Sequence, residues 1–314
     1  LGVTPAEIDV YLGDYVAAFV ENRGGTEAEL RAEVQHWYNG FCFSKTCASV
    51  YNPFSLLLLF DMQDFRNYWF ETGTPTFLIK LLRERRYDVA ALEDLRVREL
   101  SFSSYDIENL SVLPLLFQTG YLTIKGYDPE SRLYHLSYPN TEVEEAFLTY
   151  LLNEFGDLEK GTPDAYLWHL AEALEARAFD TFFAVLRALL ANIPYEIQIE
   201  REKYYQSLFY LIFKLIGLQI DAEVKTNRGR IDAVIETDGA VFIFEFKLDG
   251  SAKAALAQIK DRGYAEKYGL GRLDGLRDAV YLIGVSFGTQ ERGVVDWQVE
   301  TAGGEARRHP MPVH

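Results

Sequence analysis

The chain has 314 residues, of which 48% are hydrophobic and 14% aromatic, and a formal net charge of -16. This length and composition exclude a disordered chain and provide for two or three hydrophobic cores, so several domains are expected. The acidic balance is the opposite of the basic surface used to grip a nucleic-acid backbone, which counts against tight binding of nucleic acid by the whole chain.

The location is predicted from what the sequence lacks. No apolar stretch approaches the roughly 20 residues that span a bilayer, and the N-terminus shows no signal-peptide pattern. The two cysteines, Cys42 and Cys47, have no neighbours typical of a zinc site. We interpret them as reduced thiols outside any disulfide framework, and expect a cytoplasmic protein without membrane contact.

Residues 1–100 are predicted to form a helical domain. The pattern Thr4-Pro5-Ala6-Glu7 opens a helix that runs toward Asn22, and Thr26 caps a second that ends at about His36. Further helices are expected over 54–60 and 75–85. A group of aromatic residues fits either core packing or a platform that stacks bases, and core packing is favoured because no basic residues are interleaved: Trp37, Tyr38, Tyr68, Trp69 and Phe70.

Residues 101–156 follow the order helix, hairpin, helix, which is typical of a winged-helix-like unit. The hairpin strands are expected over 121–126 and 133–137. The helix that would be the DNA-recognition helix of such a unit starts at Asn140. It carries three acids that would repel phosphates: Glu142, Glu144 and Glu145. A structural or protein-binding role is therefore expected, with the acidic N-terminal half as the surface for a protein partner. A helical connector over 157–194 follows.

The most informative pattern begins at Asp232 and continues thirteen residues later as Glu245-Phe246-Lys247. Segments 230–235 and 241–246 alternate and are rich in β-branched and aromatic residues, which predicts a hairpin closed by a turn at 237–239. The side-chain period of two places Glu245 and Lys247 on one face of the second strand. The phenylalanines between and before them then face the core.

These residue types point to metal-dependent chemistry. Carboxylates of Asp232 and Glu245 at one end of a hairpin are the hard oxygen ligands that Mg²⁺ or Mn²⁺ prefers. The ammonium of Lys247 would orient the metal-bound water, or stabilise negative charge during phosphodiester hydrolysis. The alternative is an ordinary solvated strand face.

The flanking segments add further candidates. Glu202 lies in the first turn of a helix predicted over 201–217, as an additional ligand or as an acid favoured at a helix start. Gln258 lies on a helix predicted over 252–268 and either reaches back to the site or faces solvent. Arg228 and Arg230 either contact phosphate or balance nearby acids.

The order of these motifs resembles the PD-(D/E)XK nuclease superfamily: Glu202 on a helix, Asp232 in GRID, Glu245 and Lys247 in FEFK, and Gln258 in AALAQIKDRGYAEKY. The preceding strings resemble a bacterial family that joins an AAA-ATPase-like domain to such a nuclease-like domain: HWYNGFCFS, VYNPFSLL, NYWFETGTPTFLIKLL and LLFQTGYLTIK. The resemblance extends from about the first helix to Tyr268 and the following strand.

This resemblance implies a multidomain, mixed α/β protein. Residues 195–302 would be a restriction-endonuclease-like α/β/α domain with a mixed sheet. The tail over 303–314 is expected to be disordered. Residues 1–100 would be the lid-like helical remnant of the AAA-ATPase-like module. The Walker A pattern G-x-x-x-x-G-K-[ST] is absent and the chain starts at Leu1, so we expect part of a longer protein and no ATP site.

The function expected from these observations is metal-dependent hydrolysis of phosphodiester bonds, in DNA. Residues 195–270 contain eleven basic against twelve acidic side chains, so binding of DNA is expected to be weak or assisted by a partner. The rival interpretation is a non-catalytic nuclease fold that binds nucleic acid or protein and regulates the ATPase-like domain. A helical scaffold for partner proteins is a third interpretation.

Overall fold

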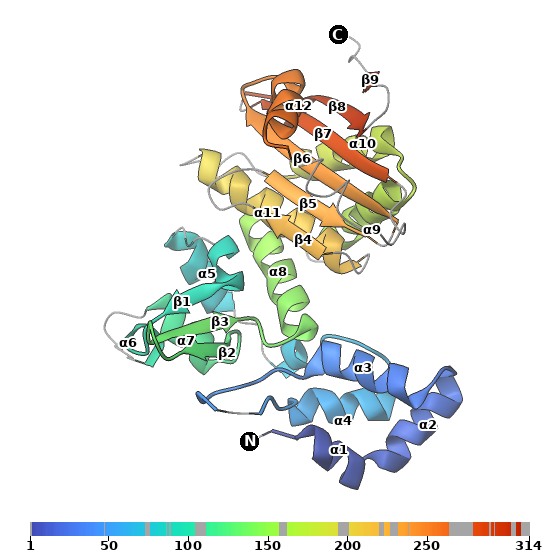
Figure 1. Cartoon of the computed structure of the whole chain (residues 1–314), viewed down its shortest axis with the longest axis vertical. Coiled ribbons are helices and arrows are strands. Elements are labelled where there is room, and N and C mark those ends of the chain that lie inside the picture. Colours follow the sequence, from blue (N-terminus) through green and yellow to red (C-terminus); the bar gives the residue numbers. More distant parts are fainter. Residues whose placement is uncertain are drawn as a thin grey trace. The chain divides into compact units, whose positions relative to one another are not determined.

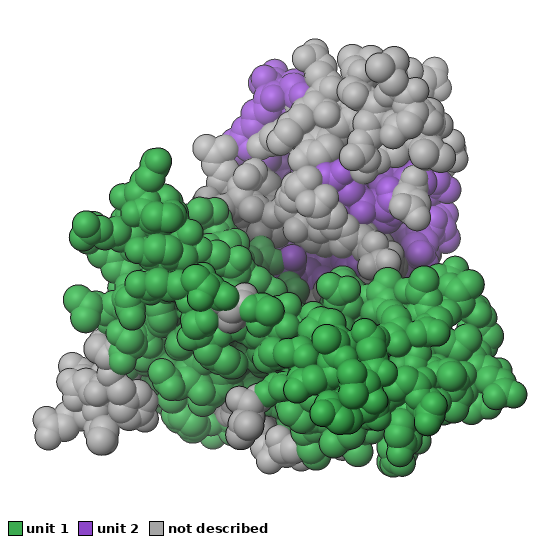
Figure 2. Space-filling view, turned by 60° about the horizontal axis from the view of Figure 1, so that its bottom comes forward, with its two compact units in different colours: residues 1–150 green, residues 151–314 purple. Residues whose placement is uncertain are grey.

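The computed structural model describes most of the chain, and its contacts divide it into two compact units, Leu1–Tyr150 and Leu151–His314. Figure 2 shows unit 1 in green and unit 2 in purple. The described residues are 2–46, 48–72, 76–85, 87, 89–103, 111–156, 162–193, 201–219, 223–226, 232–237, 239–263, 279–288, 290–291, 293–302 and 306–308. Among them, no helix has the length and apolar character that crossing a membrane requires.

Unit 1 begins with four helices: α1 (Pro5–Tyr11), α2 (Gly13–Arg23), α3 (Glu27–Tyr38) and α4 (Pro53–Met62). Thr4 with Glu7, and Thr26 with Glu29, form the predicted capping boxes. The single helix expected up to Asn22 is instead two, because the chain leaves the helical conformation at Leu12. The helix predicted over 54–60 is confirmed.

The aromatic residues of this region form a core. Tyr38, Tyr68 and Phe70 are buried, and Tyr38 stacks on Phe65 with ring centroids 6.0 Å apart. Trp37 packs against the same cluster from its edge. The preference for core packing over a base-stacking platform is confirmed, since these rings face one another.

The second part of unit 1 includes the helix and hairpin expected between residues 101 and 156. It contains η1 (Trp69–Thr72), α5 (Thr76–Glu84), η2 (Val89–Glu93), β1 (Leu95–Val97), α6 (Leu100–Ser103), α7 (Val112–Gln118), β2 (Thr123–Asp128) and β3 (Leu133–Ser137). The sheet has the order β1-β3-β2 and is antiparallel, so β1 joins the unit from a position before residue 101. Helix α7, which precedes the hairpin, is buried from Val112 to Phe117 and turns its apolar side chains into the core.

Glu142 was expected on an acidic surface, and this expectation is wrong. Glu142 lies in the first turn of α8 (Thr141–Gly156) and is fully buried. Its Oε1 accepts a hydrogen bond from the backbone N–H of Trp69 at 2.9 Å. Burial raises the pKa of the Glu142 carboxyl to about 7, although the hydrogen bond from Trp69 acts in the opposite direction.

Cys42 also differs from the expectation. It is disulfide-bonded in the structure, whereas the sequence analysis interpreted it as a reduced thiol. Cys47, the other cysteine of the chain, lies outside the described residues. The sequence did not reveal the bond, because spacing along the chain does not specify whether two sulfur atoms approach each other.

Unit 2 is a mixed sheet between helices. Its strands are β4 (Glu223–Thr226), β5 (Asp232–Glu236), β6 (Ala240–Leu248), β7 (Ala279–Gly288), β8 (Gly293–Thr301) and β9 (Ala306–Arg308), in that spatial order. Only β6 and β7 pair in parallel among these strands; the other neighbours are antiparallel. Its helices are α9 (Thr162–Glu175), α10 (Phe179–Ala191), α11 (Arg201–Gln219) and α12 (Ala252–Asp261). Figure 1 shows β4 to β8 side by side.

Three layers result from the alternation of side chains along the strands. Leu256 and Ile259 of α12 pack with Val241 and Ile243 on one face of the sheet. On the other face, Phe182 of α10 and Phe213 of α11 pack on Phe244 of β6, with centroid distances of 5.7 and 4.7 Å. This is the predicted restriction-endonuclease-like α/β/α arrangement.

The structure differs from two of the predicted boundaries. The segment predicted as a connector, 157–194, contains α10, whose Phe183 stacks on Trp297 of β8 at 4.7 Å. The tail was expected to lack structure, but residues 306–308 form β9 and pair with residues 298–300. A three-residue edge strand has too short a pattern to be recognised in a sequence.

Candidate active site

The predicted hairpin is confirmed and carries the candidate site. β5 and β6 pair antiparallel, and the backbone N–H of Thr237 donates to the carbonyl of Ala240 at 2.9 Å to close the turn. Phe246 points to the face of the sheet covered by α10 and α11, where it contacts Phe209 of α11 at a centroid distance of 4.4 Å. Glu245 and Lys247 therefore point toward the α12 side, as the period of two predicts.

Glu245 is the centre of the described part of the site. It is only 1% exposed, although a carboxylate is rarely buried without partners. Lys247 Nζ lies 3.5 Å from its Oε1, and Arg262 Nη1 lies 3.3 Å from its Oε2. A cation thus stands against each oxygen, which compensates much of the free-energy cost of burying this charge.

Helix α12 brings two side chains to this carboxylate. Ser251 caps the helix by accepting from the N–H of Ala254 at 3.1 Å. Near the C-terminal end of α12, the Oε1 atom of Gln258 accepts a hydrogen bond from Lys247 Nζ. Of the two alternatives that the sequence left open for Gln258, the structure places its side chain against Lys247.

Gly284 of β7 allows α12 to lie this close to the sheet. It pairs with Glu245 in the parallel ladder. A Cβ atom on Gly284 would lie 2.3 Å from the carbonyl oxygen of Ala252 and 2.6 Å from the nitrogen of Leu256. Both are backbone atoms of α12, so a residue with a side chain at 284 would push the helix away from the site.

Arg262 is the site residue that sequence reasoning missed. It follows the last turn of α12, four residues after Gln258, and a spacing of four places two residues on one helix face. That signal was present, but nothing in the sequence indicated how far the helix end reaches over the sheet. A quarter of the Arg262 side chain is exposed, so it stands between the buried carboxylate and solvent.

Of the other predicted site residues, the structure gives the backbone position of Asp232 and Glu202 and does not describe Arg228 and Arg230. Asp232 is directly opposite Glu245 in the β5–β6 register, on the strand face defined by Val234 two residues later, and its side chain lies outside the described residues. Glu202 is in the first turn of α11, and its side chain also lies outside them. Arg228 and Arg230 belong to the segment that the structure leaves undescribed.

The donor set is compatible with a divalent cation. Within the described ranges, no three His, Cys, Asp or Glu side chains converge on one point, so the described ligand is the Glu245 carboxylate. It is a hard oxygen donor, buried and in register with a second acid, which is the chemistry that Mg²⁺ and Mn²⁺ prefer. Binding there would require the carboxylate to share its charge with Lys247 and Arg262.

Comparison with known proteins agrees with the fold and the motif. Residues 200–297 match the family model of the PD-(D/E)XK nuclease superfamily. The chain is also similar to a protein of Azotobacter chroococcum mcd 1 described as "Uncharacterized protein in vnfD 5'region", with 40% identity over 289 residues. The match covers 87% of this chain and 53% of that protein, so the chain spans about half the length of this relative. No solved structure matches.

Residues 200–297 therefore carry a PD-(D/E)XK nuclease superfamily domain. The matched range contains β5, β6 and α12, and with them the Glu245 site. The relative has no described activity, so it adds no substrate or partner.

Proposed function

We propose that this chain is a metal-dependent nuclease that hydrolyses phosphodiester bonds in DNA. The observation that carries the proposal is the buried Glu245 carboxylate with Lys247 and Arg262 against its two oxygens, inside a PD-(D/E)XK domain. Burying one acid beside two cations contributes little to stability when an apolar residue of similar volume would suffice. A site that must hold a cation and an anionic substrate is a better explanation for such a cluster.

The proposed roles follow from position. Glu245 and Asp232 would hold Mg²⁺ or Mn²⁺, with Glu202 as a further ligand, and the ion would supply Lewis acidity and an acidified water. Lys247 would orient that water toward the phosphorus, since its ammonium already stands at the carboxylate. Gln258 accepts from Lys247 and so holds this ammonium in place.

Substrate binding is proposed to be weak or assisted. The whole chain is acidic, and Arg228 and Arg230 are the proposed contacts to the DNA backbone. Arg262 adds a cation at the entrance of the site, where a phosphate would meet it. The proposal that residues 1–100 are the lid-like remnant of an AAA-ATPase-like module is separate and rests on the resemblance of their sequence.

The test is cleavage by the purified chain. Linear, circular and branched DNA, and RNA, are incubated with and without Mn²⁺, and products are resolved on gels. Cleavage that requires Mn²⁺ and is lost in Lys247→Ala supports the proposal. Lys253→Ala is the matched control, because Lys253 is an exposed lysine in the first turn of α12.

Metal binding separates catalysis from the rival function. Calorimetry with Mn²⁺ should show binding to the wild type and little to Glu245→Gln, which removes the charged ligand at nearly constant volume. Absence of both cleavage and Mn²⁺ binding would contradict the proposal and favour a non-catalytic nuclease fold. Binding of DNA without cleavage, measured by fluorescence anisotropy, would identify that fold as a nucleic-acid-binding module.

A further inference from the structure

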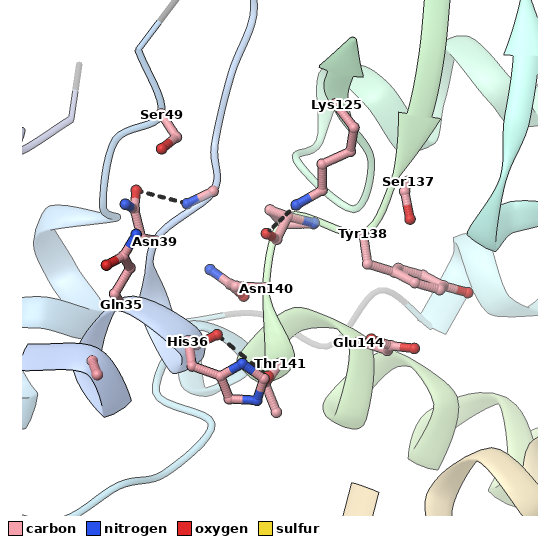
Figure 3. Close-up of a pocket in the computed structure, with 13 residues that line it drawn as sticks. Gln35, His36, Asn39, Ser49, Lys125, Ser137, Tyr138, Asn140, Thr141 and Glu144 are labelled. Atoms are coloured by element: carbon pink, nitrogen blue, oxygen red, sulfur yellow. Dashed lines mark hydrogen bonds between the residues drawn. The ribbon is translucent and has the colours of Figure 1, made fainter. Parts of the chain in front are cut away.

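A polar hollow lies in unit 1, whereas the Glu245 site belongs to unit 2. It is an open hollow of about 610 Å³, lined by the last turn of α3, the following loop, the middle of β2 and the start of α8. Volumes of this order are typical of sites for small molecules. Figure 3 shows the lining, which includes Gln35, Asn39, Lys125 and Asn140.

The walls of this hollow are tied together by specific contacts. Lys125 Nζ donates to the carbonyl oxygen of Pro139 at 2.7 Å. Gly40 has φ of 125°, and a Cβ there would lie 1.9 Å from the same oxygen, so only glycine fits. The Thr141 hydroxyl lies 3.0 Å from Nε2 of His36. The start of α8 is thus fastened to both α3 and β2.

Asn140 supplies the observation that points to a ligand. Its Oδ1 accepts from the N–H of Val143 at 3.1 Å, as an N-cap, and this bond fixes which end of the amide is oxygen. The residue is 8% exposed, and Nδ2 has no hydrogen-bond acceptor among the described residues. Figure 3 shows the nitrogen end directed into the hollow between α3 and Lys125. A buried donor without an acceptor is destabilising unless a bound group satisfies it.

The other groups around Asn140 also favour an acceptor with negative charge. Asn39 is 6% exposed and uses its Oδ1 to accept from the N–H of Gly40 at 2.8 Å, which leaves its amide NH₂ as the donor. The Lys125 ammonium stands on the other side, and the N-terminus of the 16-residue helix α8 contributes a positive partial charge. Glu144 is the acid in the lining, and its carboxylate points away from the Asn140 amide in Figure 3.

We propose that this hollow binds a small molecule through an anionic oxygen group, a phosphoryl or carboxylate group, which accepts from Asn140 Nδ2 and pairs with Lys125. The site uses none of the residues of the nuclease domain. It therefore stands or falls independently of the nuclease proposal.

The experiment measures binding of inorganic phosphate and, separately, of acetate to the whole chain by calorimetry and by shifts of backbone amide resonances at residues 140–143. Saturable binding is expected. Asn140→Asp keeps the N-cap, since Asp and Asn cap equally well, but exchanges the amide donor for a negative charge. We expect it to weaken binding by at least about tenfold, the effect of losing one hydrogen bond to a charged group.

Two further variants make the result specific. Lys125→Met removes the ammonium at similar length and should also weaken binding. Asn22→Asp adds the same charge at an exposed asparagine that bonds Gln63, and should leave binding unchanged. The anion that binds identifies the ligand as a phosphoryl or a carboxylate compound.

Three outcomes would overturn the proposal: no saturable binding of either anion, equal binding by Asn140→Asp and the wild type, or an equal loss in Asn22→Asp. The last would indicate a general effect of charge. Circular dichroism and melting of each variant confirm that the fold is retained, and Lys125→Met decides the question if Asn140→Asp fails to fold.

Discussion

Arg262 Nη1 lies 3.3 Å from Oε2 of Glu245, and this ion pair joins the end of α12 to the middle of the central strand β6. The carboxylate is buried while the guanidinium is partly exposed. In the absence of a metal ion, Arg262 and Lys247 are the described groups that neutralise Glu245. The pair links the stability of unit 2 to the occupancy of the site.

Replacing Arg262 by alanine should therefore destabilise the metal-free protein. We expect the free energy of unfolding to fall by about 1.5–3 kcal/mol, the range for a hydrogen bond to a charged group. Saturating Mn²⁺ should restore part of this loss, because an ion on Glu245 replaces the missing positive charge. Urea denaturation with and without Mn²⁺ measures both effects. Arg262→Lys is the control that retains a charge, and an equal response to Mn²⁺ in all three proteins would argue against this coupling.

Gly284→Ala should displace α12. The added Cβ would meet backbone atoms at 2.3 and 2.6 Å, which cannot rotate away as a side chain would. We expect a loss of about 1–3 kcal/mol in stability, as for other overpacked cores, together with weaker Mn²⁺ binding since Gln258 and Arg262 move with the helix. Gly126→Ala, in strand β2 with open space around its Cβ position, is the control. A Gly284→Ala protein with wild-type stability and metal affinity would refute this account of the helix position.

Gln258→Leu should separate catalysis from metal binding. The leucine cannot accept from Lys247, so the ammonium loses its fixed position while Glu245 is unchanged. We expect the cleavage rate to fall by about 10- to 100-fold, as for other residues that orient a catalytic group, with Mn²⁺ affinity retained. Gln258→Glu keeps an acceptor and should retain more activity. Equal loss of Mn²⁺ affinity and cleavage in the leucine variant would contradict a positioning role.

Glu142 should make the stability of unit 1 depend on pH. Its pKa rises from the ordinary 4.5 to about 7 on folding, so the folded state holds a proton that the unfolded chain releases. The free energy of unfolding therefore falls as pH rises from 4.5 to 7, by at most about 3 kcal/mol, and this contribution is absent above pH 7. If the free energy of unfolding of the wild type rises with pH in this window, relative to a variant that lacks the Glu142 carboxyl, the predicted direction is wrong.

The variant for this test is Glu142→Gln, which keeps an acceptor for the Trp69 N–H. It should lack the decline between pH 4.5 and 7 and exceed the wild type in stability at pH 8. Denaturant unfolding across this range provides the comparison. Exposed Glu130→Gln is the control, in which the wild-type slope should remain.

The parts of the fold that the sequence predicts are those that local chemistry determines. Capping boxes marked the starts of α1 and α3. The β-branched and aromatic residues on either side of a turn predicted the β5–β6 hairpin, and the side-chain period of two predicted the face that carries Glu245. Helix caps and strand periodicity involve residues only a few positions apart, so the sequence alone is enough to recognise them. The division at Leu12 was missed although Gly13 directly follows it, because a single glycine within a helical pattern does not by itself indicate a break.

The parts that the sequence did not predict depend on packing between distant segments. The burial of Glu142 depends on the backbone of Trp69, more than 70 residues earlier, and the reach of Arg262 depends on Gly284. A glycine inside a strand does indicate close approach of another backbone, but it does not name the partner. The Asp232 position opposite Glu245 was predicted, whereas the proposed roles of Asp232 and Glu202 await the experiments above.

The parallel pairing of β6 with β7 has a consequence for how the protein is made. Glu245 and Gly284 are register partners, yet 38 residues separate them in the chain, and a parallel pair needs a crossover before any of its bonds can form. Closing such a loop costs conformational entropy before the hydrogen bonds between β6 and β7 can stabilise the sheet. During synthesis, the β5–β6 hairpin can form as soon as it leaves the ribosome, but Glu245 stays uncovered until β7 emerges and α12 docks. The cluster of Glu245, Lys247 and Arg262 is thus completed late in folding.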